Sequence, residues 1–181
     1  MLAYAAGRAQ AFDTLYARHK GPVYRFLLRQ CGSAGVAEEL FQDLWMSDIR
    51  AKATYAPTAK FTTWIYTLAR HRLIDHWRAH GQVGFVSIDD DDDDAQSRVE
   101  SIAGPRGDEP ETRIESGEIA RRLAAALAEL PALQREAFLL QQEAGMSLAQ
   151  IAATTGAGEE TVKSRLRYAT AKLRAALEPL R

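Results

Sequence analysis

Cysteine is nearly absent from this chain, since Cys31 is the single cysteine among 181 residues. One thiol excludes an internal disulfide and any metal site built from several cysteines, and it is consistent with a reducing cytosol. No apolar run approaches the length of a membrane span, and the N-terminus lacks the cationic start and apolar core of a secretory signal. The sequence therefore predicts a cytoplasmic protein without membrane insertion.

Net charge is also nearly absent, at −1, but the charges are segregated along the chain. Residues 1–80 carry 11 Lys/Arg against 6 Asp/Glu and residues 119–181 carry 9 against 6, whereas residues 81–118 carry 3 against 12. The carboxylates of Asp89–Asp94 repel one another, and a Gly/Pro cluster at 104–110 opposes a helix. We expect an acidic flexible linker over residues 81–117 between two mildly basic blocks that suit a polyanionic partner.

Side-chain groupings typical of catalysis are missing as well. No Ser-His-Asp order, phosphate-cradling glycine loop or isolated carboxylate pair stands out. His76 and His80 are four residues apart with Asp75 nearby, but no third ligand has a convincing spacing for a metal. The sequence predicts a protein that is not an enzyme and that holds neither a cofactor nor a metal.

What the chain does contain is the pattern of a helix-turn-helix over Met146–Leu177. Ser147 suits the N-cap of a short helix, and residues 154–158 supply a glycine turn. In the longer helix that follows, an apolar stripe that includes Val162, Leu166 and Leu173 predicts a buried side. The opposite side can donate hydrogen bonds to phosphates or bases through Lys163, Ser164, Arg167, Tyr168 and Arg174. This pattern favours DNA binding, and a helical hairpin with a solvated basic face is the alternative.

Two more helices are expected ahead of this motif. One runs from about Glu115 to Leu130, and Pro131 begins another that ends before Gly145. Together the four helices predict a compact DNA-reading domain over residues 118–181.

The N-terminal block, residues 1–80, has the pattern of a helical bundle. A first helix is expected to end at Gly21-Pro22, and Pro22 begins a second helix that ends before Gly32. A third helix is expected from about Ala34 to Ala51. Its apolar residues lie on two sides, with Trp45 opposite the main face, so it is either deeply buried or shared with a partner.

A Pro-containing loop, residues 53–60, leads into the helix Phe61–Arg78, which is crowded with aromatic and cationic residues. Such an arrangement suits unstacked bases and phosphates. The alternative is that Trp64 and Trp77 belong to the core. The predicted fold class is therefore all-α, with two small helical domains joined by the linker.

In this order the segments resemble, end to end, the extracytoplasmic-function (ECF) sigma factors of bacterial RNA polymerase, which belong to the sigma-70 family. Residues 11–19 look like the opening helix of that family and residues 37–45 like its clamp-binding helix. Residues 61–78 are similar to the helix that melts and reads the −10 element. Residues 130–137 and 161–166 resemble the two halves of the −35-reading domain.

The resemblance implies an alternative sigma factor of the bacterial cytoplasm that binds core RNA polymerase through the β′ clamp and β subunits. It further implies promoter DNA as a partner and control by an anti-sigma factor. The positions that match the family's polymerase-binding helix are Glu39, Gln42, Asp43 and Trp45.

The resemblance also assigns the DNA-reading positions. The −10 element would be read by Tyr55, Lys60, Tyr66, Arg70, His71 and Arg78. The −35 element would be read by Lys163, Ser164, Arg167 and Tyr168, with Arg135 holding phosphate. The chain departs from the family pattern at Val36, where an acidic residue is common, at His71 in place of Asn, and at Tyr168 in place of Arg.

Two other readings remain open at this point. A helix-turn-helix regulator that does not join the polymerase would explain the C-terminal block but not the surplus aromatic residues of the N-terminal one. A protein-interaction module, such as a decoy for an anti-sigma factor, would leave Lys163 and Arg167 on a merely solvated face.

Overall fold

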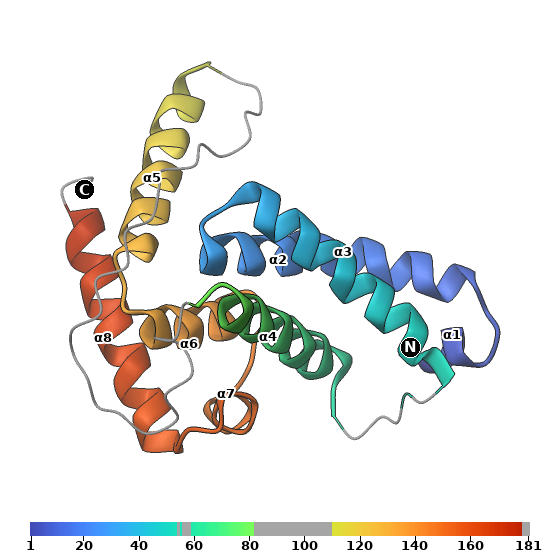
Figure 1. Cartoon of the computed structure of the whole chain (residues 1–181). Coiled ribbons are helices and arrows are strands. Elements are labelled where there is room, and N and C mark those ends of the chain that lie inside the picture. The colour runs from blue at the N-terminus through green and yellow to red at the C-terminus, as the bar shows by residue number, and fades with distance from the viewer. Residues whose placement is uncertain (54, 56–58, 82–109, 179–181) are drawn as a thin grey trace.

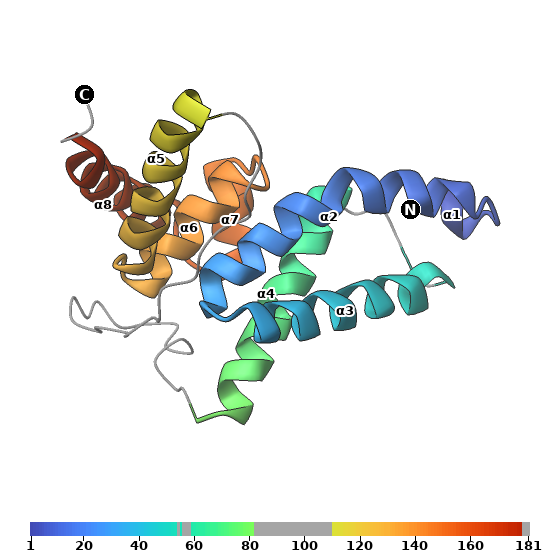
Figure 2. The ribbon, with the colours of Figure 1, turned by 90° about the horizontal axis from the view of Figure 1, so that it is seen from above.

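A computed structural model of the chain describes residues 1–53, 55, 59–81 and 110–178. For residues 53 and 110–116 it describes the backbone alone. In this part of the chain every regular element is a helix, as predicted. The helices form two groups, α1–α4 and α5–α8, which meet in the middle of the molecule (Figures 1 and 2). Residues 82–109 of the predicted acidic linker, including Asp89–Asp94, lie outside the described residues, whereas residues 110–117, also predicted to be linker, are helical.

The N-terminal group begins with α1 (Leu2–Ala5) and the long helix α2 (Gln10–Cys31). The sequence predicts two helices where α2 is continuous, and that expectation is wrong because α2 runs through Pro22. A proline inside a helix costs about 3 kcal/mol, because its ring nitrogen donates no hydrogen bond. Burying a large apolar side chain returns about 1.5–3 kcal/mol. Val23, Phe26 and Leu27 are all fully buried just after the proline, so packing outweighs that cost.

Helix α3 (Ala34–Arg50) begins at Ser33, whose hydroxyl accepts a hydrogen bond from the Val36 amide. A short 3₁₀ turn, η1 (Ala51–Ala53), follows, and then comes α4 (Phe61–Ala79). Both α-helices begin at the predicted residue and end within one residue of the predicted end. The core between them and α2 includes Phe26 and Tyr66, whose rings meet edge to face with centroids 5.2 Å apart.

The C-terminal group consists of α5 (Pro110–Ala128), α6 (Ala132–Gln142), α7 (Leu148–Thr155) and α8 (Glu159–Leu177). Helix α5 begins at Pro110, earlier than predicted, at the first helical position that proline tolerates. Helix α7 has the predicted cap, where Ser147 and Gln150 bond each other's backbone amides reciprocally. Gly156, with φ 74°, ends α7, and α8 buries its apolar stripe, which confirms the helix-turn-helix.

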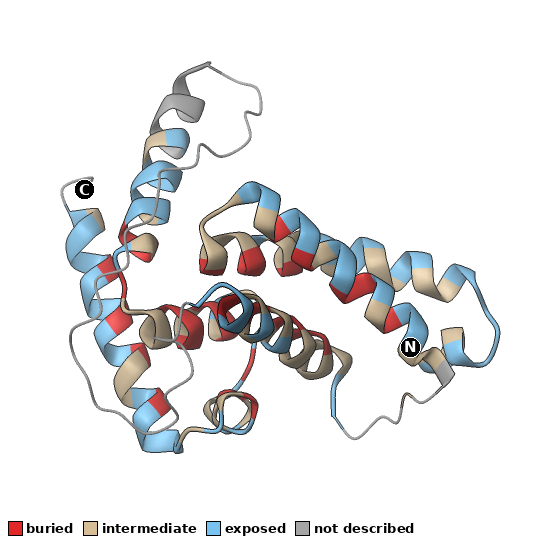
Figure 3. Ribbon diagram, in the orientation of Figure 1, coloured by how far each residue is buried: buried red, intermediate tan, exposed pale blue. Residues whose placement is uncertain are grey.

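The two groups pack directly on each other through α2 against α6 and α4 against α7. Buried positions on α2, α4 and α6 gather where the groups meet (Figure 3). The same core continues through both groups, from Phe26 and Leu73 to Leu139 and Ile151. The protein is therefore closed, with the helix-turn-helix held beside the N-terminal bundle.

Candidate nucleic-acid and polymerase interfaces

The outer face of α8 presents cationic and aromatic side chains to solvent. Lys163 and Arg167 are exposed, and Tyr168 is 52% exposed. The Arg167 guanidinium lies over the Tyr168 ring, 5.0 Å from its centroid, and its Nη2 donates to the Tyr168 hydroxyl at 3.4 Å. Lys163 Nζ lies 3.5 Å from both carboxylate oxygens of Glu160. Exposed pairs of this kind are weak, so these donors stay available to another anion.

Ser164 and Arg135, the other two predicted −35 residues, are less accessible. Ser164 is half-buried on the same helix. Arg135, predicted to hold phosphate, is only 3% exposed, and its Nη1 donates to the Ala128 carbonyl at 3.1 Å. Burial lowers the pKa of its guanidinium. In this arrangement Arg135 ties α6 to the end of α5 and cannot reach DNA.

Helix α4 and the segment before it carry the predicted −10 residues, of which four reach the surface. Lys60, His71 and Arg78 are exposed, and His71 and Arg78 share one face of α4 at a seven-residue spacing. Tyr55 is half-buried and meets Trp64 edge to face with centroids 5.4 Å apart. Phe61 also packs on Trp64, with the ring centroids 5.7 Å apart.

Tyr66 and Arg70 differ from the prediction, because both are covered. Tyr66 is 1% exposed, and burial raises the pKa of its hydroxyl well above the ordinary value. The Arg70 side chain is 15% exposed and its Nε donates to Glu136 of α6 at 2.9 Å. A helical wheel places both residues on one face of α4, but it does not reveal that α2 packs on Tyr66 and that α6 pairs with Arg70.

Helix α3 has an exposed face that is acidic in its first half and apolar in its second. Glu39, Gln42 and Asp43 are exposed, followed by Met46 at 48% and Ile49 at 37%. These five positions fall on one side of the helix, which the i, i+3, i+4 spacing requires. They form a continuous surface that a partner helix could cover.

Trp45, predicted to bind the polymerase, lies elsewhere. It is 5% exposed, and its ring packs against Tyr16 and Phe12 of α2 at 4.9 and 5.9 Å between centroids. The second apolar side of α3 is therefore divided. Trp45 packs on α2, whereas Met46 and Ile49 face solvent.

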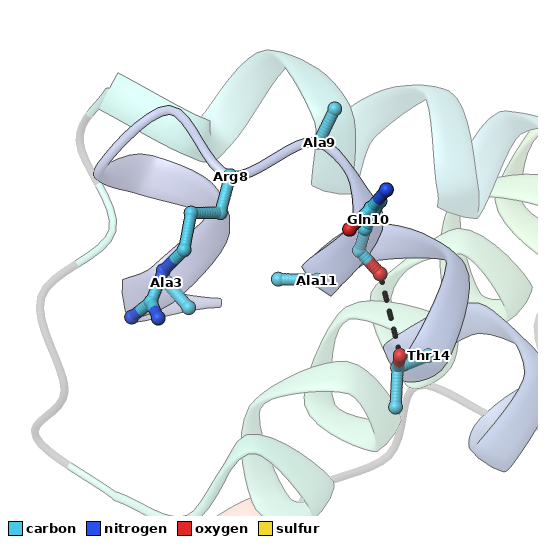
Figure 4. Close-up of a pocket in the computed structure, with 6 residues that line it drawn as sticks. All are labelled: Ala3, Arg8, Ala9, Gln10, Ala11 and Thr14. Atoms are coloured by element: carbon cyan, nitrogen blue, oxygen red, sulfur yellow. Dashed lines mark hydrogen bonds between the residues drawn. The ribbon is translucent and has the colours of Figure 1, made fainter.

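No described feature resembles a catalytic centre. The hollow between α1 and the start of α2 is lined by Ala3, Arg8, Ala9, Gln10, Ala11 and Thr14 (Figure 4). Its lining contains no carboxylate, imidazole or thiol, and the Thr14 hydroxyl donates to the Gln10 carbonyl at 3.3 Å. Within the described ranges no three His, Cys, Asp or Glu residues gather as metal ligands. No helix there is long and apolar enough to cross a membrane.

Comparison with known proteins decides what these two helix groups are. Residues 15–83 match the family Sigma-70 region 2, and residues 120–173 match Sigma-70, region 4. ECF RNA polymerase sigma factor SigL of Mycobacterium tuberculosis is 32% identical over 97% of this chain and 94% of its own length. The chain belongs to the ECF sigma factors. RNA polymerase sigma factor CarQ of Myxococcus xanthus is 31% identical over 96% of this chain and 93% of its own.

Two solved structures share the fold of this ECF sigma factor. The sigma factor RpoE of Bartonella quintana, in complex with the anti-sigma factor NepR, aligns with a TM-score of 0.69 and 22% identity over 94% of this chain and 98% of its own. CnrH, in complex with the cytosolic domain of CnrY, aligns with a TM-score of 0.64 and 23% identity over 98% and 95%. The chain is thus an alternative sigma factor that directs transcription initiation, because regions 2 and 4 occur in one protein. A regulator that does not join the polymerase is not favoured.

Proposed function

We propose that this ECF sigma factor docks on core RNA polymerase through the exposed face of α3, and reads its promoter with α4 and α8. The observation that carries the proposal is that two chemically different surfaces stand on one chain. One is acidic and apolar, which suits a protein helix, and the other is cationic and aromatic, which suits nucleic acid. Each surface lies within a region matched to the sigma-70 family.

The polymerase surface consists of Glu39, Gln42, Asp43, Met46 and Ile49, all exposed on α3. Exposed apolar side chains beside a carboxylate pair offer both buried area and charge complementarity to a basic helix of the β′ clamp. Trp45 supports this surface from beneath, because its ring holds α3 against α2. Its role is to keep the helix in place rather than to touch the polymerase.

The −35 surface is the outer face of α8. A recognition helix enters the major groove and reads base edges, and an Arg that bonds two acceptors of a guanine is the commonest specific contact. Arg167 and Lys163 are the exposed cations of this face, and Tyr168 holds Arg167 in place through the ring contact. Ser164 would contact the backbone or a base edge at close range.

The −10 surface is formed by Tyr55, Phe61, Trp64, His71 and Arg78. A base that leaves the duplex needs an aromatic partner for stacking and polar groups along its edge. The half-buried rings of Tyr55, Phe61 and Trp64 can supply the first, and exposed His71 the second. Lys60 and Arg78 are the exposed cations that would bind the phosphates on either side.

We further propose that the protein acts in the cytoplasm by binding alone, without catalysis, and that an anti-sigma factor controls it. Of the two solved relatives, RpoE is in complex with the anti-sigma factor NepR, and CnrH is in complex with the cytosolic domain of CnrY. The exposed faces of α3 and α8 would be the surfaces that such a partner masks.

The test is initiation by purified core polymerase on fragmented genomic DNA, with the transcripts sequenced. The wild-type chain is expected to give defined start sites that share upstream sequence. Reversing charge with Lys163→Glu and Arg167→Glu should abolish them, whereas Arg121→Glu, on the exposed face of α5, should leave them unchanged. The proposal fails if the wild-type chain neither co-elutes with core polymerase nor starts any transcript.

A further inference from the structure

The surfaces on which the two helix groups meet carry carboxylates on one side and guanidinium groups on the other. Glu143, at the end of α6, receives hydrogen bonds from two arginines of α2. Arg25 Nη2 lies 2.9 Å from Glu143 Oε2, and Arg29 Nη1 lies 2.5 Å from Oε1. The Glu143 side chain is only 8% exposed, so one carboxylate of the C-terminal group is enclosed by cations of the N-terminal group.

A second pair joins α6 to α4. Arg70 Nε donates to Glu136 Oε1 at 2.9 Å, and Arg70 Nη2 donates to the Thr155 carbonyl at 3.4 Å. Burial raises the pKa of Glu136, although the neighbouring Arg70 opposes that rise. Gln150 Nε2 adds a bond to Thr63 Oγ1 at 3.3 Å. All of these bonds link residues of different groups, so all of them break when the groups separate.

Other polar atoms near this interface are buried without a partner among the described atoms. They include the Tyr66 hydroxyl and Arg135 Nε. Glu143 is close enough to help raise the pKa of Tyr66, and Cys31 of α2 is close enough to affect that of Arg135. Water would satisfy both atoms in an open chain, so they favour opening. The ion pairs therefore act together with the shared apolar core to hold the two groups closed against this unfavourable contribution.

The closed arrangement cannot engage a whole promoter. The −35 and −10 elements are separated by roughly 25 base pairs, which is about 85 Å at 3.4 Å per pair. A compact chain of 181 residues has a radius of gyration of only about 16 Å. The two groups must therefore separate before α8 and α4 can read both elements. In the closed chain, moreover, the Arg70 guanidinium donates a hydrogen bond to the carboxylate of Glu136. In an open chain the same guanidinium would be available to bind a phosphate.

We propose that Glu136 and Glu143 form a latch that keeps the sigma factor closed and withholds Arg70 from promoter DNA until the polymerase separates the two groups. This inference rests on the proposed function, because it concerns the regulation of the same DNA-reading surfaces. The latch is intramolecular, so it acts on the free chain without an anti-sigma factor. The apparent affinity for core polymerase is proportional to the fraction of chains that are open and able to bind. When most chains are closed, polymerase binding is therefore weaker in proportion to the small open fraction.

The test measures the dimensions of the full-length chain by small-angle X-ray scattering. The double variant Glu136→Gln, Glu143→Gln keeps the side-chain shapes and removes both charges. We expect it to have a larger radius of gyration than wild type at about 50 mM salt. The difference should persist at about 500 mM, because salt screens buried ion pairs such as those of Glu136 and Glu143 only weakly. Glu118→Gln removes a carboxylate whose ion pairs among the described residues lie within α5, so it is the matched control and should behave as wild type.

A charge exchange separates the latch from a general loss of stability. Glu143→Arg should open the chain, and adding Arg25→Glu and Arg29→Glu should close it again. Far-ultraviolet circular dichroism must show equal helicity for every variant compared. An unchanged radius of gyration in both the Gln double variant and Glu143→Arg, with helicity intact, overturns the latch.

Binding to core polymerase provides the functional readout. The Gln double variant should reach half-saturation of promoter complexes at a several-fold lower concentration than wild type or Glu118→Gln. An opened variant with no such gain overturns the claim that the latch limits DNA reading. If the variants open in scattering but neither they nor wild type start transcripts, the proposed function fails while the latch stands.

Discussion

Asp48 offers the sharpest test of the packing around α3. Its side chain is fully buried, and neither carboxylate oxygen has a hydrogen-bond partner among the described atoms. Burial disfavours the charged form and raises the pKa of this carboxyl from 3.8 to about 6. At neutral pH the protein therefore holds a buried charge that costs stability.

The sign and size of the effect follow from the two pKa values. A carboxyl whose pKa is raised in the folded state contributes stability that is fully present below about pH 3.8 and is lost as the pH rises through about 6. At about 1.36 kcal/mol per pKa unit, the complete loss is about 3 kcal/mol. Most of it, about 2.4 kcal/mol, falls between about pH 4 and pH 7.5.

The perturbation is Asp48→Asn, which keeps the shape and cannot ionise. Urea denaturation followed by circular dichroism should give the variant and wild type similar free energies of unfolding near the acid end. The variant should then gain on wild type by about 2–3 kcal/mol toward pH 7.5. Asp43→Asn, at an exposed site on the same helix, is the control and should stay parallel to wild type. Parallel curves for Asp48→Asn across this range would refute the assignment of a raised pKa to a buried carboxyl.

Four further predictions concern the DNA-reading and polymerase-binding surfaces and the fold. Arg167→Ala should lower the binding free energy of the polymerase complex at its own −35 element by about 1–3 kcal/mol, as measured by quantitative footprinting. The melting temperature of the protein should not change, because the side chain is exposed. An equal loss of affinity on every promoter would make Arg167 a phosphate contact. Trp45→Ala should lower the free energy of unfolding by about 3–5 kcal/mol, since the ring is buried. Asp43→Arg should instead weaken co-elution with core polymerase and leave stability within about 0.5 kcal/mol; equal stability losses in the two variants would contradict this division. Ser147→Ala should cost about 1 kcal/mol in urea titration, because it removes the hydroxyl that caps α7; an unchanged midpoint would mean that the Gln150 half of the cap suffices.

The sequence by itself determined most of the helices and the chemistry of α8. Capping at Ser147, the glycine turn at Gly156 and the apolar stripe of α8 depend on residues within a few positions of one another. Such interactions are local, so a pattern of spacing is enough to predict them. The sequence also indicated the family, because the order of its motifs is a property of the chain and not of its folding.

Only the tertiary structure decided what covers each helix face. Periodicity puts Tyr66 and Arg70 on one side of α4, but their burial depends on α2 and on Glu136 of α6, which lies 66 residues from Arg70 in the chain. In the same way, Pro22 stays inside α2 because the residues after it are packed in a core formed by distant helices. A residue's accessibility depends on contacts between segments far apart in sequence. No local pattern specifies those contacts, and they are what places the C-terminal group against one face of α4 in this sigma factor.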